Sequence, residues 1–305
     1  MRQHLDALEY HGELGFNRDY YSRRVRMELL AMSAASIDRY LRRFRASAKR
    51  AAPVVRSSIS ISDLGTLFDP EPGFVECDVL QHGDPSHGDL GYGDRGHGHS
   101  MARTLNLTCV HTGWTFTRTM CSGAGMDDIL EASIDPAHGV PFALTRVDFN
   151  HGNEQLRRVC AAWAERHGIQ VSQLRPIMRD GGISHSKSHH MVHRYGFRLP
   201  YRTEAECSLL NRLWRLVNDR LNFLTPTKKP VGWEYSGTGR KKRVYDVPAT
   251  PVDRLLTAGV TSPAQEAELR EYRRELNPAR MSREISEIQA VLMANTASAP
   301  EFVSV

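Results

Sequence analysis

The chain contains 305 residues, of which 40% are apolar and 25% are charged. This length and apolar content allow one large domain or two to three small ones with a real hydrophobic core. The formal net charge is +5, which is compatible with a polyanionic partner but does not identify one. No apolar run reaches the roughly 18 residues that a helical membrane span needs, so we expect no membrane partner.

The N-terminal residues and the cysteines both indicate in which cellular compartment we expect the protein. The start of the chain lacks the apolar core of a signal peptide, which predicts a cytoplasmic protein. The cysteines are widely spaced and form no CxxC pair, so we expect buried small side chains in a reducing compartment. They are Cys77, Cys109, Cys121, Cys160 and Cys207.

The first predicted elements are two helices joined by a short link. Residues 19–31 carry apolar residues at helical spacing, and Ser33 caps a second helix over 34–45. This arrangement predicts a helix-turn-helix whose second helix lies in the major groove of DNA. The alternative is a plain helical hairpin with a solvated basic face. The cations expected to contact DNA are Arg39, Arg42 and Arg43.

Strand and helix patterns then alternate through the middle of the chain. Strand patterns cover 74–80, 103–110, 114–119, 141–149 and 169–174, and helix patterns cover 127–132, 154–167 and 204–221. In the middle strand Leu105, Leu107 and Cys109 share one face. Propensity alone predicts a mixed α/β fold, and the order of elements is that of an RNase H-like domain.

The last part of the chain begins with a proline-rich, basic segment over 223–250. A second basic cluster lies within it and is also expected to contact DNA; it is formed by Arg240, Lys241, Lys242 and Arg243. Ser262 and Gln265 form a capping box at the start of a helix, and a further helix begins at Pro278, which predicts a final helical hairpin. The expected domains are a helix-turn-helix segment over 1–50, a linker over 51–71, an RNase H-like core over 72–222 and a basic and helical region over 223–305.

Several short motifs follow one another in a fixed order over most of the chain. They include Leu29-Leu30-Ala31-Met32-Ser33, Pro72-Gly73-Phe74-Val75-Glu76-Cys77-Asp78, Thr112-Gly113-Trp114-Thr115, Tyr195-Gly196-Phe197 and Leu210-Asn211-Arg212-Leu213-Trp214. In this order the chain resembles the integrase-core transposases of bacterial insertion sequences, which belong to the retroviral-integrase-like superfamily. The N-terminal region of that family is usually longer.

The resemblance implies metal-dependent DNA cleavage and strand transfer. Such a core holds two Mg²⁺ or Mn²⁺ ions with an Asp on the first strand, an Asp after the fourth strand and a Glu on the following helix. Asp78 fits the first position, and strand alternation places Glu76 on the same face. Lys187 matches a basic position expected to touch DNA phosphate.

The other two positions depart from the family pattern. The second reads Asn150-His151-Gly152-Asn153-Glu154-Gln155 where the family has Asp-Asn-Gly-Ser-Glu-Phe. The third falls on His185, or on Ser186 without a one-residue deletion, and neither is a carboxylate. Asp148, two residues before Asn150 on the same strand, and Glu154 are the candidate replacement ligands.

Two groups of histidines suggest a different metal. His185, His189 and His193 recur at helical spacing, which would put their imidazoles on one helix face as zinc ligands. The second group lies in and around a glycine-rich insertion and comprises His82, His87, His97 and His99. The alternative to a zinc site, which we favour, is that a surface loop and a helix face are rich in histidine without binding zinc.

Three functions therefore remain open. The first is an active recombinase that uses Asp78 with Asp148 or Glu154. The second is a catalytically dead member of the family that binds DNA through residues 19–50 and represses or regulates its own element. The third is a zinc-binding interaction module. The first two functions predict a nucleoid-associated protein whose partner is double-stranded DNA, both the ends of the element and its target. The resemblance also implies a homo-oligomer.

Overall fold

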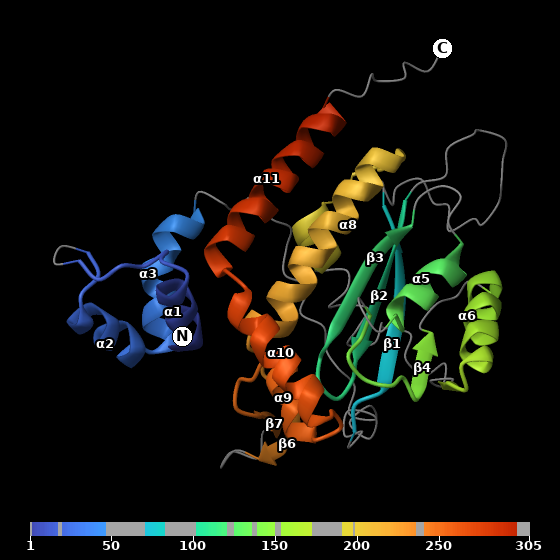
Figure 1. The fold of residues 1–305 in the computed structure, drawn as a ribbon, viewed down its shortest axis with the longest axis horizontal. Coiled ribbons are helices and arrows are strands. Elements are labelled where there is room, and N and C mark those ends of the chain that lie inside the picture. Colours follow the sequence, from blue (N-terminus) through green and yellow to red (C-terminus); the bar gives the residue numbers. More distant parts are fainter. Residues whose placement is uncertain are drawn as a thin grey trace.

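The computed structural model describes residues 2–17, 20–46, 71–82, 102–120, 125–135, 139–149, 154–172, 191–197, 199–235 and 241–297. Within these ranges the protein is a mixed α/β molecule. A five-stranded sheet stands at its centre, with helices on both faces (Figure 1). This confirms the α/β class that the alternating strand and helix patterns predict.

The sheet combines an antiparallel half with a parallel half. Its strands are β1 (Phe74–Gln81), β2 (Arg103–Cys109), β3 (Thr115–Met120), β4 (Arg146–Phe149) and β5 (Gln170–Ser172). They lie in the order β3-β2-β1-β4-β5. β1, β2 and β3 pair antiparallel, whereas β4 and β5 run parallel to β1. β4 is shorter than the predicted strand over 141–149, since its ladder begins only at Arg146.

Gly73 sets the start of β1 against the segment that leads into β4. Its φ of +126° lies in a region that L side chains rarely adopt, and a Cβ there would meet Thr145 Oγ1 at 2.7 Å and Ala143 O at 2.9 Å. The Gly73 carbonyl accepts a hydrogen bond from the Thr145 N–H. The glycine therefore allows two chain segments to approach closely beside the first residues of β1.

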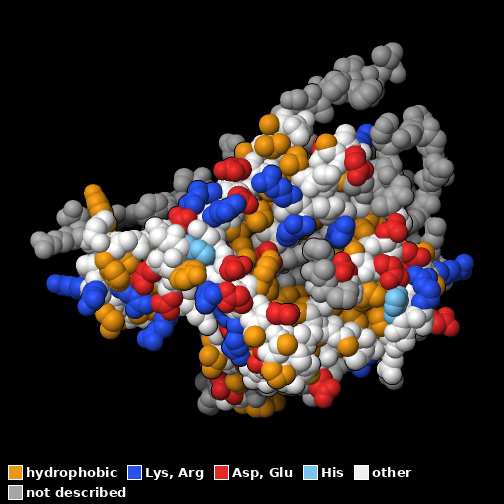
Figure 2. Space-filling model, viewed as in Figure 1, with side chains coloured by type: hydrophobic (Ala, Val, Ile, Leu, Met, Phe, Trp, Pro, Cys, Tyr) orange, Lys and Arg blue, Asp and Glu red, His pale blue; other side chains and the backbone are white. Residues whose placement is uncertain are grey.

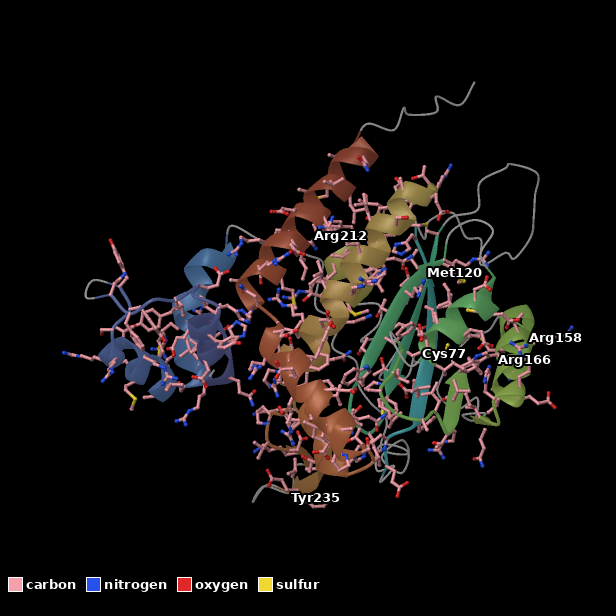
Figure 3. All side chains as sticks on the ribbon, in the orientation of Figure 1. Cys77, Met120, Arg158, Arg166, Arg212 and Tyr235 are labelled. Atoms are coloured by element: carbon pink, nitrogen blue, oxygen red, sulfur yellow. The ribbon has the colours of Figure 1, made fainter. Side chains whose placement is uncertain are left out.

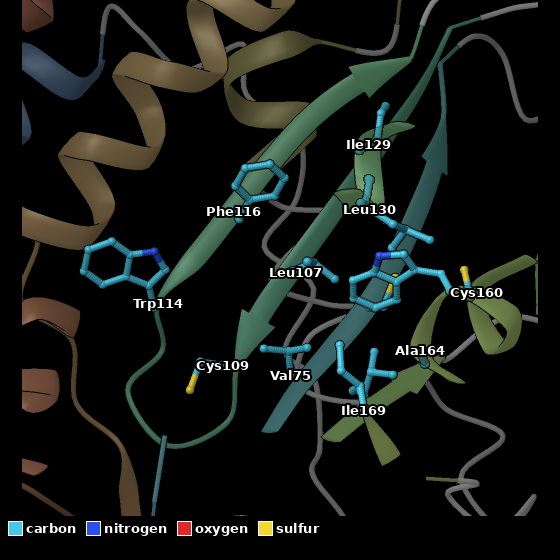
Figure 4. Close-up of a cluster of buried hydrophobic side chains, with 14 of the residues drawn as sticks. Val75, Leu107, Cys109, Trp114, Phe116, Ile129, Leu130, Cys160, Ala164 and Ile169 are labelled. Carbon is cyan, nitrogen blue, oxygen red and sulfur yellow. The ribbon is translucent and has the colours of Figure 1, made fainter. Parts of the chain in front are cut away.

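One face of the sheet is apolar and packs against α5 (Met126–Ser133) and α6 (Glu154–Arg166). Leu105, Leu107 and Cys109 are at most 1% exposed on this side, which confirms the alternation predicted for the middle strand. Trp163 of α6 is fully buried among them. Figure 4 shows this core, with Ile129 and Leu130 from α5 and Cys160 from α6 directed at the strands.

The opposite face of the sheet is polar, and it is buried as well. Register pairs Thr104 with Thr119, Asn106 with Thr117 and Thr108 with Thr115, and none of these side chains is more than 7% exposed. Helix α8 (Glu204–Asp219) and the helical residues 191–196 contact this face. Beyond it, a second core joins α8 to α11 (Pro278–Ala297) through Met281, Ile285, Ile288 and Leu292.

The C-terminal region contains elements that the sequence patterns did not reveal, namely η2 (Arg220–Leu224), β6 (Pro230–Tyr235), β7 (Lys241–Tyr245) and α9 (Pro251–Ala258). They are followed by α10 (Pro263–Glu275), which begins where the capping box of Ser262 and Gln265 predicts a helix. β6 and β7 form a two-stranded antiparallel ribbon at the lower end of the molecule in Figure 1. α10 and α11 follow one another nearly end to end, and α11 lies along α8 (Figure 1).

The N-terminal helices form a lobe beside α11 (Figure 1). They are α1 (Arg2–Tyr10), α2 (Arg23–Ala31) and α3 (Ala34–Ala46), and α1 was not predicted. Ser22 caps α2 by accepting a hydrogen bond from the Val25 N–H. Among the described side chains of this lobe only Leu5 and Tyr21 are buried, so apolar packing holds it weakly.

The cysteines divide into two kinds. Cys77, Cys109 and Cys160 are free and buried, as predicted. Cys207 is disulfide-bonded, so the prediction of a reduced thiol is wrong at this position. Over the described ranges, no helix is both long and apolar enough to cross a membrane.

Candidate functional site

Asp78 lies at the centre of the molecule. It belongs to β1, which lies between β2 and β4 at the centre of the sheet. Its side chain is 0% exposed, and its register partner on β2 is Asn106. Strand alternation puts it on the polar face together with Glu76, as predicted. A carboxylate in this position is costly to bury unless it has a charged or hydrogen-bonding neighbour, which favours a functional role.

Asp148 supplies a second buried carboxylate on the adjacent strand. It is 3% exposed, and the parallel ladder pairs it with Glu76 of β1. Asp148 and Asp78 are therefore diagonal neighbours, about 8 Å apart at Cα for ideal strand spacings. The described ladder ends with Cys77 and Phe149, one residue short of the Asp78 position.

The pKa of the neighbouring Cys77 thiol reflects the negative charge of this region. Figure 3 labels Cys77 on β1, where it faces the apolar core. Burial raises its pKa well above the ordinary value, and the Cys160 thiol raises it further, followed by smaller effects of Asp78 and Asp148. Both carboxylates thus oppose ionisation of this thiol.

Asn106 sits beside Asp78 in a network that fixes its amide. Its Nδ2 donates to Thr108 Oγ1 at 3.0 Å, and its Oδ1 accepts from Thr117 Oγ1 at 2.8 Å. Sequence reasoning missed this residue. The signal was present, because Thr104, Asn106 and Thr108 are the polar half of the alternation whose apolar half was used to predict β2.

His82 follows β1 on the same side and is 3% exposed. Its Nε2 shares a 2.7 Å hydrogen bond with Thr104 Oγ1, which in turn bonds Thr119 Oγ1 at 2.7 Å. Trp214 of α8 donates its indole N–H to Thr119 Oγ1 at 2.6 Å. Burial, with a smaller effect of His193, lowers the pKa of His82 to about 4. The structure therefore brings one member of each histidine group into the same region.

The side chains available as metal ligands can be compared with the preferences of the predicted metal ions. Mg²⁺ and Mn²⁺ prefer oxygen ligands, and Asp78 and Asp148 offer two carboxylates on adjacent strands, which fits such an ion in part. Among the described residues there is no group of three or more His, Cys, Asp or Glu side chains that could hold a metal. Further ligands would have to come from elsewhere in the chain.

Several predicted site residues fall outside the described ranges. These are Asn150, His185 and Lys187 of the core, Arg240 of the basic cluster, and His87, His97, His99 and His189. Glu154 begins α6, but its side chain is not among those described, and the same is true of the side chains of Arg43, Lys241 and Arg243.

The cations predicted to bind DNA are exposed where they are described. Arg39 and Arg42 are exposed on α3, and Lys242 is exposed on β7, with its Nζ 3.2 Å from Glu234 Oε1. Figure 2 shows Lys and Arg side chains together with hydrophobic ones on the surface of the N-terminal lobe, at the left. Tyr40 is 71% exposed there, so the outer face of α3 is both basic and aromatic.

Fold and site together define a mixed α/β protein that carries two buried carboxylates on adjacent parallel strands. The chain is 30% identical over 263 residues to "Uncharacterized protein y4rM" of Sinorhizobium fredii (strain NBRC 101917 / NGR234), covering 82% of this chain and 69% of that protein. The chain belongs to the same family as that protein. No protein-family model matches the chain.

Proposed function

We propose that the protein is a DNA-binding member of the integrase-core transposases, with an RNase H-like core and a weakened capacity for metal-dependent phosphoryl transfer. One observation carries this proposal: Asp78 is buried on the central strand of a sheet ordered β3-β2-β1-β4-β5, with Asp148 on the parallel strand beside it. An RNase H-like core places its first metal-binding Asp on the same strand of such a sheet.

Asp78 and Asp148 would hold a divalent ion, Mg²⁺ or Mn²⁺. When bound, such an ion supplies a more acidic water and stabilises the charge that develops on a phosphoryl oxygen. Asn106 and its threonine partners would keep the Asp78 side of the site in a fixed geometry. Asn150 and His185 replace charged family ligands with neutral ones, so affinity for a second ion would fall, and cleavage with it.

The test is nicking of a supercoiled plasmid by the whole chain in Mn²⁺. The natural protein is compared with Asp78→Asn and with the double variant Asn150→Asp/His185→Glu. We expect the double variant to nick at least tenfold faster than the natural protein, because two carboxylates rejoin the site. We expect Asp78→Asn to remove nicking from both backgrounds. Nicking that survives Asp78→Asn would place the chemistry elsewhere and refute this site.

A second candidate function is DNA binding without cleavage, as a repressor or regulator of the protein's own element. Two observations favour it: α2 and α3 are joined by only Met32 and Ser33, and Arg39 and Arg42 of α3 are exposed. The same nicking assay separates the two functions. If the natural protein never cuts but binds DNA with strong salt dependence, binding is the surviving activity. Self-association on DNA is the corresponding proposal for its assembly.

A further inference from the structure

A row of aromatic rings leads from the core of the sheet to the surface of α10. Trp114, directly before β3, is 6% exposed, and its ring meets the ring of Phe223 in η2 edge to face at a centroid distance of 5.3 Å. Phe223 is 4% exposed and meets the Tyr272 ring of α10 at 5.1 Å. Tyr272 is 45% exposed, so the row ends in solvent. Figure 4 shows the Trp114 ring at the margin of the core, away from Ile129 and Leu130.

The exposed end of this row has a proton acceptor. The Tyr272 hydroxyl donates to Asp219 Oδ2 at 2.9 Å, a distance that allows direct proton transfer. Burial raises the pKa of Asp219 to about 6, although the hydrogen bond from Tyr272 and the charge of Arg215 oppose this shift. The carboxylate is therefore ionised at neutral pH and more basic than an ordinary aspartate. Burial, followed by the charge of Asp219, also raises the pKa of Tyr272, so the phenol keeps its proton until it is oxidised.

The core at the inner end of the row contains side chains that oxidation would damage. Trp114 belongs to the same buried cluster as Met120 and Cys109, and the Cys109 N–H donates to the Trp114 carbonyl at 2.8 Å. Cys77 and Cys160 are free thiols of the same cluster. Oxidised thiols and thioethers are polar, so they are costly to keep in an apolar core. An oxidising equivalent that stayed in this core would therefore disrupt its packing.

We propose that Trp114, Phe223 and Tyr272 form a relay that moves a one-electron oxidising equivalent from the core to the surface, with Asp219 as the proton acceptor. The relay goes beyond the proposed function and depends on neither DNA binding nor a metal ion. Packing alone accounts for the edge-to-face contacts between the rings. The half-buried carboxylate that accepts from the exposed phenol adds the chemical function, because a phenol loses an electron readily only when a base takes its proton.

Each step of the relay conserves electrons and protons. A radical oxidant, such as the carbonate radical anion, takes one electron from the Trp114 indole and leaves a radical cation. Tyr272 then gives one electron to Trp114 across the Phe223 ring and its phenolic proton to Asp219, which restores the indole and leaves a neutral tyrosyl radical. A thiol in solution returns a hydrogen atom to Tyr272, and Asp219 releases its proton to water. The transfer runs outward because a phenol that loses its proton is easier to oxidise than an indole.

The experiment exposes the whole chain to the carbonate radical anion with a nitroso spin trap present, and peptide mass spectrometry locates the trapped radicals. Tyr20 and Tyr235 are 83% and 72% exposed, so attack governed by exposure would mark them more than Tyr272. We expect Tyr272 to carry more trapped radical than either. In Tyr272→Phe, oxidation of Trp114 should rise severalfold, because its radical is no longer reduced from the surface. The matched control is Tyr245→Phe, at a side chain that is 48% exposed, and it should leave oxidation of Trp114 unchanged.

Two further variants test the inner step and the proton transfer. Phe223→Leu interrupts the ring contacts, so it should lower trapping at Tyr272 and raise oxidation of Trp114, with the urea unfolding midpoint measured to confirm folding. Asp219→Asn should lower trapping at Tyr272, because an amide takes up no proton. If Phe223→Leu does not fold, Tyr272→Phe and Asp219→Asn decide the question. Trapping that follows exposure, or equal oxidation of Trp114 in Tyr272→Phe and in the control, would overturn the relay.

Discussion

His82 is neutral in the interior because water is replaced there by hydroxyl and aromatic groups. Its ring bonds Thr104 and lies 5.1 Å from the Tyr201 ring, in an edge-to-face arrangement. Burial is the largest cause of its lowered pKa, and His193 adds a smaller effect. The residue therefore couples the stability of the polar sheet face to pH. Its burial and its contacts with Thr104 and Tyr201 give it a role in packing this region.

The folded pKa of His82, about 4, lies below its ordinary unfolded value, so the unfolded chain binds a proton more readily. This contribution to stability is complete above about pH 6.5 and is lost as the pH falls toward 4. We expect the free energy of unfolding to drop by about 2 kcal/mol between pH 7.5 and 5 from this group alone. Urea unfolding at several pH values measures it. An unchanged pH dependence in His82→Gln would contradict the assignment.

At the scale of elements, α8 and η2 protect the edge of the sheet. β3 is an edge strand, and three asparagines at helical spacing cover its outer backbone groups. Asn222 accepts from the Thr115 N–H and donates to the Thr115 carbonyl, both at 2.8 Å, and Asn211 does the same with Thr119. Asn218 donates to the Thr117 carbonyl at 3.2 Å. An open edge favours pairing with other chains, so this cover also opposes aggregation.

Replacing Asn222 by Leu should therefore destabilise the protein. The variant leaves the Thr115 N–H and carbonyl in a buried place without this partner, at a cost of about 2 to 4 kcal/mol. Urea unfolding measures the change, and light scattering should show more aggregation. Arg212→Ala, an exposed position on α8, is the control and should change stability by less than about 0.5 kcal/mol. Equal effects at both positions would argue against edge protection.

At the scale of the whole molecule, polar contacts attach the N-terminal lobe to the C-terminal helices. Arg283 of α11 donates to both carboxylate oxygens of Glu13, at 2.7 and 3.0 Å, and Asn277 donates to Glu13 at 2.9 Å. Arg273 donates to Gln3 Oε1 at 2.7 Å. The hydrogen bond from Arg283, followed by that from Asn277, lowers the pKa of Glu13 to about 2. The attachment of the lobe is thus largely electrostatic.

Reversing the charge of Glu13 should detach α1 without unfolding the core. In Glu13→Lys, repulsion from Arg283 replaces attraction, so amide hydrogen exchange over residues 2–10 should accelerate while exchange in β1 and α8 stays unchanged. High salt should produce a weaker version of the same effect, because screening reduces exposed ion pairs. The swapped pair Glu13→Lys/Arg283→Glu should restore protection. Failure to restore it would indicate that packing of Leu5, not the ion pair, holds the lobe.

Helices and strands that are marked by a pattern of neighbouring residues were predictable from the sequence. The alternation of Leu105, Leu107 and Cys109 predicted a half-apolar strand, and Ser262 with Gln265 predicted the start of α10, where the structure has a capping box. Glu76 and Asp78 were correctly placed on one face by alternation alone. α1 escaped prediction because it buries only Leu5, which leaves no apolar stripe to recognise.

The sequence by itself determined the α/β class and the central strands, because each depends on residues close together in the chain, whereas the role of Asp78 is implied only by the family resemblance and stays a prediction. Only the tertiary structure decided that Asp148 neighbours Asp78, that His82 lies near His193, and that β6 and β7 form a two-stranded ribbon. These relations join residues far apart in the chain, through strand register and helix packing. Local periodicity carries no information about such pairings, since the same strands could pair in several orders with equal burial.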